Sequence, residues 1–207
     1  MMKKFQCELR SWDDMWNLSK EVAKKIRNSG YRPDFIIGVT RGGWVPAMNL
    51  SDLLGIKDLL ALKVEHWGIT ATETGKAELK FPLNIDLSGK KILLVDDLTD
   101  TGESIKLCID HIRGLNPEEI KTATLMHKVR SKFEPDFYAE RIEEWKWIIF
   151  PWNITEDLCN LIDRVMKEQK VREVETIRNA LKDTFDLDVG EETIREILRE
   201  LKYRTHL

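Results

Sequence analysis

The amino-acid sequence predicts an α/β protein, in which a doubly wound, mainly parallel sheet is followed by an all-helical C-terminal extension. Three observations lead to this fold class. Short apolar runs alternate with amphipathic helical stretches, polar or glycine-containing breaks follow the apolar runs directly, and the pattern after residue 153 is helical throughout. Continuous apolar runs are typical of strands buried on both faces of a sheet. We therefore expect a sheet domain at residues 1–153 and a helical extension at residues 154–207.

The elements of the sheet domain follow from hydrophobic periodicity. Residues Trp12–Arg27 are expected to form a helix, because apolar residues such as Trp16 and Val22 recur at near-helical spacing. The next elements are expected in the order strand 35–39, helix 47–55, strand 58–67, strand 90–95, helix 103–113, strand 120–128 and strand 146–150. Residues 66–81, rich in threonine and glycine, are expected to be a mobile loop. In parallel sheets ligands bind at the carboxyl ends of strands, so we expect the site after residues 39, 95 and 128.

Composition limits the classes of partner. The 207 residues carry a formal net charge of -3, so neither nucleic acid nor an anionic membrane is an expected partner. The three cysteines are widely separated and show no C-x-x-C spacing, which favours reduced thiols over a disulfide framework or a zinc site. No apolar run approaches the length of a membrane span, and the first residues lack an apolar signal region. We expect a soluble, cytoplasmic protein.

The stretch ILLVDDLTDTGES, at Ile92–Ser104, places two adjacent carboxylates after a buried strand. Such an arrangement also occurs in Walker-B strands, but these require a glycine-rich G-x-x-x-x-G-K-[ST] loop, which this sequence lacks. Response-regulator receivers need a phosphoacceptor aspartate at the end of a later strand. The candidates after Asp110 are Asp136, outside the expected strands, and residues of the helical extension. Both interpretations therefore fit poorly.

The continuation TDTGES predicts a phosphate-binding loop. Unpaired backbone N–H groups converge where a loop enters a helix, and the helix dipole adds positive charge there. Hydroxyl groups of Thr99, Thr101 and Ser104 can donate to phosphate oxygens, and Gly102 lets the backbone approach closely. The two preceding carboxylates would repel a phosphate but suit the hydroxyls of a ribose. The motif thus predicts a site for a ribose 5-phosphate.

This stretch resembles the phosphoribosyl-diphosphate-binding motif of the type I phosphoribosyltransferases. The resemblance extends through TRGG, HK and KWIIFPW, over about residues 11–153, and is closest to the xanthine-guanine branch of the purine enzymes. It implies an enzyme of purine salvage that transfers the 5-phosphoribosyl group from phosphoribosyl diphosphate to a purine base. The products would be a nucleoside monophosphate and pyrophosphate. A 6-oxopurine (hypoxanthine, guanine or xanthine) is favoured as the base, and adenine is the alternative.

The resemblance also implies the roles of individual residues. Asp96 and Asp97 would hold the ribose hydroxyls and, directly or through water, a magnesium ion that is bound mainly by the substrate. Asp100 would be the general base, although an aspartate there can also cap the following helix. The 5-phosphate would bind to Thr99, Asp100, Thr101, Gly102, Glu103 and Ser104, and the pyrophosphate to Thr40, Arg41, Gly42 and Gly43. A cis peptide is expected at Arg41–Gly42, and the loop at residues 66–81 would act as a lid.

Four residues are implied at the purine. Lys128 would donate to the O6 atom, Trp147 would stack on the ring, and Ile148 would offer its main chain. Ile149 stands where the bacterial xanthine-guanine enzymes carry a carboxylate near the purine 2-position, which puts a preference for guanine in doubt.

The helical extension matches no family that we can name. It contains three apolar stripes, at residues 158–166, 174–181 and 194–201. Some transcriptional regulators join a DNA-binding module to a phosphoribosyltransferase-like domain that only senses its ligand. From Asn153 onward, however, ten basic residues stand against thirteen acidic ones, whereas a DNA-binding module should be basic. We therefore favour an enzyme over a non-catalytic regulator. Its expected partners are its substrates and a second copy of the chain in a homodimer.

Overall fold

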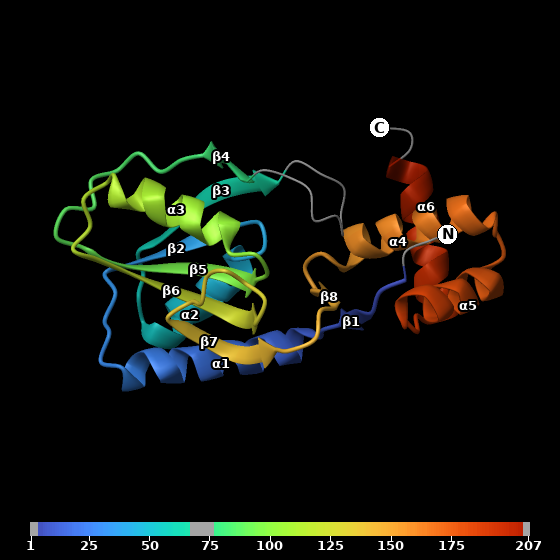
Figure 1. Ribbon diagram of the computed structural model, residues 1–207, viewed down its shortest axis with the longest axis horizontal. Helices are drawn as coiled ribbons and strands as arrows, with labels where there is room; N and C mark the ends of the chain where they lie inside the picture. The colour runs from blue at the N-terminus through green and yellow to red at the C-terminus, as the bar shows by residue number, and fades with distance from the viewer. Residues whose placement is uncertain (1–3, 67–76, 205–207) are drawn as a thin grey trace. The chain divides into compact units, whose positions relative to one another are not determined.

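The computed structural model describes residues 4–66 and 77–204 (Figure 1). Backbone contacts divide the chain into two compact units. The sheet unit comprises residues 12–144, and the helical unit joins the segment up to Ser11 to the chain from Trp145 onward. This division differs from the boundary expected at residue 153. The reason is that strand β1 (Cys7–Leu9) pairs with strand β8 (Trp147–Ile149), so both ends of the sheet region belong with the helices.

The sheet unit contains a six-stranded sheet in the order β4-β3-β2-β5-β6-β7. Its strands are β2 (Phe35–Thr40), β3 (Leu59–His66), β4 (Ala77–Phe81), β5 (Lys91–Thr99), β6 (Glu119–Lys128) and β7 (Phe137–Ile142). The neighbouring strands are parallel, except that β4 runs antiparallel to β3. Residues 92–95 of β5 are fully buried, as expected for a strand covered on both faces. The predicted α/β fold class is confirmed.

Helices cover both faces of this sheet (Figure 1). Helices α1 (Trp12–Asn28) and α2 (Trp44–Leu54) contact each other on one face, and α3 (Glu103–Arg113) packs against β3, β4 and β5 on the other. Helix α2 ends at Gly55, which has the left-handed φ of 71° that glycine adopts without strain. The three helices agree with the sequence prediction in position. Within α1 the expected residue Val22 is buried, but Trp16 is exposed and Met15 is buried in its place, so Trp16 lies outside the apolar face of the helix.

Several strand assignments differ from the sequence prediction, which contained no strand at β1, β4 or β7. Strand β7 was not expected, because its sequence FYAERI is charged and it lies at the edge of the sheet, where a continuous apolar run is unnecessary. The expected strand at residues 146–150 exists as β8, but it pairs with β1 in a separate two-stranded sheet. The main sheet therefore ends at β7 and not at the KWIIF segment.

The loop expected at residues 66–81 is partly structured. Residues 77–81 form β4, which pairs with β3 across a register shift near Lys63 and Val64. The rest of the expected lid, residues 67–76, lies outside the described residues. Strand β4 was not predicted because its sequence is largely polar, as is possible for a strand at the edge of a sheet.

The helical unit consists of β1, β8 and the helices α4 (Ile154–Gln169), α5 (Val174–Phe185) and α6 (Glu191–Arg204). The three helices pack on one another, as the three apolar stripes predict. Their core includes the fully buried residues Ile162, Leu181 and Phe185, and it also takes in Cys7 from β1 and Ile149 from β8. No helix in the described parts of the chain has the length and apolar character needed to cross a bilayer.

The sheet topology brings the motifs of the sequence together. Strands β2, β5 and β6 are neighbours and run parallel, so their carboxyl ends lie at the same edge. The segments TRGG, DDLTDTGES and HK follow or end these three strands. The edge is therefore the candidate site.

Candidate active site

Asp96 and Asp97 lie within the last part of β5, which continues to Thr99 and not only to Val95 as expected. The backbone N–H of Asp97 donates to Oδ1 of Asp96 at 2.9 Å. Burial, and then the charge of Asp97, raise the pKa of Asp96 well above its usual range. Hydroxyl donors or a cation would relieve this repulsion, so the pair is suited to a ribose diol or a metal ion.

The TRGG loop at the end of β2 packs against these carboxylates. A Cβ atom on Gly42 would lie 2.1 Å from Oδ2 of Asp97, and one on Gly43 would lie 2.4 Å from the carbonyl oxygen of Val95. The glycines are therefore required by close approach. The amide of Gly43 donates to the Val39 carbonyl at 2.8 Å, so it belongs to the fold of the loop and not to an open anion-binding nest. The cis peptide is Thr40–Arg41, one bond before the position expected.

The TDTGES loop connects β5 to α3. Gly102 is the N-cap of α3, with a left-handed φ of 83°, so the alternative role of Asp100 as the helix cap is wrong. The amide of Glu103 donates to Oγ1 of Thr101 at 3.4 Å. Thr99 is buried and its hydroxyl donates to Oγ1 of Thr124 at 3.3 Å, so its side chain faces the sheet. The hydroxyl of Thr99 is thus engaged inside the fold, which leaves residues 100–104 as the candidate phosphate loop.

The turn between β6 and β7 lies against this loop. A Cβ on Gly102 would be 2.5 Å from Cβ of Phe133 and 3.0 Å from Oγ of Ser131. The amide of Lys132 donates to the carbonyl of Thr101 at 3.3 Å. The two segments are thus held together at the edge of the sheet.

Asp100 forms the centre of a charged cluster. Nζ of Lys128 donates to its Oδ2 at 2.9 Å, and Nε and Nη2 of Arg130 donate to its Oδ1 at 3.0 and 2.7 Å. Burial opposes ionisation of Asp100, but the hydrogen bonds and charges of Lys128 and Arg130 outweigh it and hold the pKa of Asp100 below its ordinary value. Asp100 is therefore a carboxylate at neutral pH.

Lys128 is only 2 % exposed, although a lysine at a strand end usually reaches solvent. Burial lowers the pKa of Lys128, and the contact with Asp100 partly offsets this. The strand places the ammonium and the carboxylate side by side, one a donor and one an acceptor.

Arg130 is the cluster member that the sequence prediction missed. It follows the expected strand by two residues in the segment HKVR, and nothing in its spacing distinguishes it from a surface arginine. Only the turn after β6 brings it back to Asp100.

The residues implied at the purine ring belong to the helical unit. Nε1 of Trp147 donates to Oδ1 of Asp157 at 3.3 Å, and its ring packs against the helical core. Ile148 and Ile149 are buried, the latter fully. The backbones of Trp147 and Ile149 bond to Gln6 and Arg10, so in a parallel ladder the backbone of Ile148 points away from β1.

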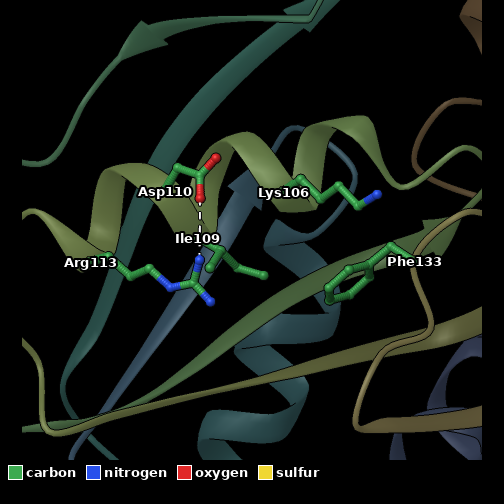
Figure 2. Close-up of a pocket in the computed structure, with 5 residues that line it drawn as sticks. All are labelled: Lys106, Ile109, Asp110, Arg113 and Phe133. Atoms are coloured by element: carbon green, nitrogen blue, oxygen red, sulfur yellow. Dashed lines mark hydrogen bonds and ion pairs between the residues drawn. The ribbon is translucent and has the colours of Figure 1, made fainter.

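A separate hollow lies along α3 (Figure 2). It is lined by Lys106, Ile109, Asp110, Arg113 and Phe133, and none of the residues implied in catalysis or binding is among them. Asp110 and Arg113 form an exposed ion pair at 3.4 Å across its rim. The hollow therefore does not coincide with the candidate site.

No group of three or more histidine, cysteine or acidic side chains in the described residues could hold a metal ion alone. Magnesium, however, is commonly bound by one or two carboxylates together with substrate phosphates. Asp96 and Asp97 supply hard oxygen donors of this kind, and the pKa of Asp96 is raised by its burial and then by the neighbouring charge of Asp97. The pair fits a magnesium ion carried mainly by a diphosphate substrate.

Residues 7–157 match the phosphoribosyl transferase domain family. The chain belongs to this family. It is therefore a phosphoribosyltransferase, with the fold of the type I enzymes, as the sequence motifs predict.

Named relatives and solved structures agree with this assignment. The chain is 32 % identical to a xanthine-guanine phosphoribosyltransferase of Cereibacter sphaeroides, over 70 % of this chain and 85 % of that protein. It is 28 % identical to a hypoxanthine-guanine phosphoribosyltransferase of Aquifex aeolicus, over 62 % and 73 % of the two chains. A purine phosphoribosyltransferase from Pyrococcus horikoshii superposes with a TM-score of 0.62 at 34 % identity, covering 71 % of this phosphoribosyltransferase and 93 % of that chain.

Proposed function

We propose that this phosphoribosyltransferase acts in purine salvage and transfers the 5-phosphoribosyl group from phosphoribosyl diphosphate to a 6-oxopurine. The observation that carries the choice of base is the pairing of Lys128 with Asp100 at 2.9 Å. A 6-oxopurine presents O6 and N7 on one edge. A lysine donor for O6 beside a carboxylate acceptor for a proton on N7 is complementary to that edge.

In the proposed reaction, a bond forms between N9 of the base and the anomeric carbon while the bond from that carbon to pyrophosphate breaks. The proton of the imidazole ring passes to the Asp100 carboxylate. Asp96 and Asp97 hold the ribose hydroxyls, and their charge favours the cationic character of the sugar in the transition state. Residues 100–104 bind the 5-phosphate, and the loop with Arg41 binds the diphosphate. Positioning and electrostatics supply the catalysis.

Magnesium is the proposed cofactor. Asp96 and Asp97 would hold it together with oxygens of the substrate, and when bound it neutralises the charge of the pyrophosphate leaving group. Activity should therefore be lost on chelation and regained with added magnesium.

Adenine is the less favoured base. Its 6-amino group is a donor and would face the ammonium of Lys128, which is also a donor. Among the 6-oxopurines we expect hypoxanthine to be preferred to guanine, because the resemblance implies that Ile149, and not a carboxylate, stands at the position for the 2-amino group.

A ligand-sensing regulator without catalysis is the second alternative. The site of a regulator would need no general base. In this protein, however, Asp100 is held ionised beside Lys128, the proposed donor to the purine. The acidic balance of the helical extension also disfavours a DNA-binding role.

The three cysteines are free and buried, which fits our placement of the enzyme in the reducing cytoplasm.

The test is pyrophosphate release from phosphoribosyl diphosphate and magnesium, with hypoxanthine, guanine, xanthine, adenine and orotate supplied separately. We expect turnover with 6-oxopurines, and a fall in kcat of about 10²- to 10⁴-fold in Asp100→Asn, since general-base catalysis contributes on this scale. Turnover with adenine alone would contradict the base assignment. Tight binding of phosphoribosyl diphosphate with no release for any base would instead favour the regulator.

A further inference from the structure

Arg130 contacts the proposed general base, but the reaction described above assigns it no task. Its guanidinium donates twice to Oδ1 of Asp100, at 3.0 and 2.7 Å, while Lys128 donates to Oδ2. The two oxygens of one carboxylate are thus divided between two cations. Within the described residues, the charged side chains that contact Asp100 are these two.

The division has a consequence for the proposed function, on which this inference rests. In the proposed complex the ammonium of Lys128 donates to O6 of the base and its contact with Oδ2 weakens, while Oδ2 becomes the acceptor for the imidazole proton. Asp100 is then held less firmly by Lys128 at the moment when it must stay ionised. A partly buried carboxylate without cationic partners favours the protonated form, which is not a base.

We propose that Arg130 is a positioning residue that holds Asp100 in place and ionised through Oδ1 while Lys128 exchanges Oδ2 for the purine base. An arginine suits this task better than a lysine. Its fork of donors fixes the orientation of a carboxylate, and it stays charged at every accessible pH.

The backbone that carries Arg130 is tied to the loop that carries Asp100. The amide of Ser131 donates to the Lys128 carbonyl at 2.9 Å, and the amide of Lys132 donates to the Thr101 carbonyl at 3.3 Å. The hydroxyl of Ser131 closes the turn on the carbonyl of Phe133 at 2.9 Å. The guanidinium is therefore presented from a backbone that is fixed relative to its target, which is the condition for preorganisation.

A surface ion pair would have the same distances but no effect on catalysis. Arg178 and Asp188 provide the matched case, because Nε and Nη2 of Arg178 donate to a single oxygen of Asp188 at 2.9 and 2.8 Å. That pair belongs to α5 and the turn that follows it in the helical unit. Arg178→Gln is therefore the control for loss of a two-bond arginine contact.

The experiment compares wild type, Arg130→Gln, Arg130→Lys and Arg178→Gln in the pyrophosphate-release assay with hypoxanthine across pH. We expect Arg130→Gln to lower kcat by about 10- to 100-fold, the scale for a misplaced catalytic group, with the KM for phosphoribosyl diphosphate nearly unchanged. The acidic limb of kcat/KM should move to higher pH. Arg130→Lys should recover part of the lost kcat and part of the shift in the acidic limb, and Arg178→Gln should match wild type in both.

A second readout does not depend on turnover. Carbon-13 NMR of the Asp100 carboxyl in the free protein should titrate at higher pH in Arg130→Gln than in wild type. An active wild type, with an Arg130→Gln variant that keeps its kcat and pH profile, would overturn the role of Arg130 alone. An inactive wild type would overturn the proposed function. The NMR titration would then still test the role of Arg130, because an equal titration midpoint in Arg130→Gln and wild type would show that Arg130 does not keep Asp100 ionised.

Discussion

At the scale of single residues, the decisive feature is that Asp100, Lys128 and Arg130 share one hydrogen-bonded cluster. Each contact is ordinary for a salt bridge, but Lys128 is buried and Asp100 lies on the loop that enters α3. Removal of one member leaves a buried charge without its partner, which costs more than the pair itself contributes. The cluster therefore affects both stability and chemistry.

The stability of the fold should depend on Asp100 in a pH-dependent way. Because the pKa of Asp100 is lowered in the folded state, its contribution is complete above the unfolded pKa of about 3.9 and is lost as pH falls through the lower folded pKa. Asp100→Asn should therefore lower the free energy of unfolding at pH 7 by about 1–3 kcal/mol. Urea unfolding at pH 7 and at pH 2–3 should show the difference between the two proteins shrinking with acid.

Asp188→Asn serves as the control, because Asp188 is an exposed partner of an arginine. An exposed pair contributes about 0.2–1 kcal/mol, so this variant should stay close to wild type. Equal stability of Asp100→Asn and wild type at pH 7 would contradict the coupling of Asp100 to Lys128.

At the scale of elements, the site depends on how closely the TRGG loop approaches β5. The atoms that exclude a side chain differ between the two glycines. At Gly42 they belong to the carboxylate of Asp97, whereas at Gly43 they are backbone atoms of Val95 and Asp96. A side chain can rotate away, but the backbone of a central buried strand cannot.

Two substitutions should separate function from folding at this loop. Gly42→Ala should displace the Asp97 carboxylate and strongly reduce turnover, with the melting temperature little changed. Gly43→Ala should destabilise the protein by about 1–3 kcal/mol, the usual cost of overpacking. Thermal melts and the pyrophosphate assay distinguish the two effects, and Gly190→Ala, where a Cβ meets nothing within 4 Å, is the neutral control. A Gly42→Ala variant with full activity would contradict the proposed role of Asp97 in the site.

At the scale of the whole molecule, the surface of the sheet unit carries large apolar side chains. Trp12 and Trp16 lie four residues apart on α1, and Trp44 and Met48 lie four residues apart on α2. These side chains are all exposed, Met48 by 53 %. In the homodimer that the family resemblance implies, we expect these side chains to be buried, because contiguous apolar surface is typical of interaction sites.

We expect light scattering to give twice the chain mass of 24.2 kDa at working concentrations. Met48→Glu should shift the protein toward the monomer, because a charge buried at an apolar contact is unfavourable. Tyr203→Glu alters a similarly exposed residue on α6 and should leave the mass unchanged. A monomeric wild type would contradict the dimer.

The sequence by itself determined the fold class and the family, and it predicts a ribose-phosphate site at the TDTGES motif. Local patterns are sufficient for these, because continuous apolar runs mark buried strands and a phosphate loop needs its residues in unbroken order. The same patterns located the three helices of the extension. They failed for β4 and β7, since edge strands are only partly buried and can be polar.

Only the tertiary structure decided which groups meet. It assigned β8 to the helical unit, turned the hydroxyl of Thr99 into the sheet and made Gly102 the cap of α3. It also brought Arg130 to Asp100, two residues that are thirty positions apart in the chain. Periodicity records whether a side chain is buried, but the partner of a charge depends on the path of a turn and on strand order. For that reason the motif could be predicted from the sequence, whereas the cluster of Asp100, Lys128 and Arg130 could not.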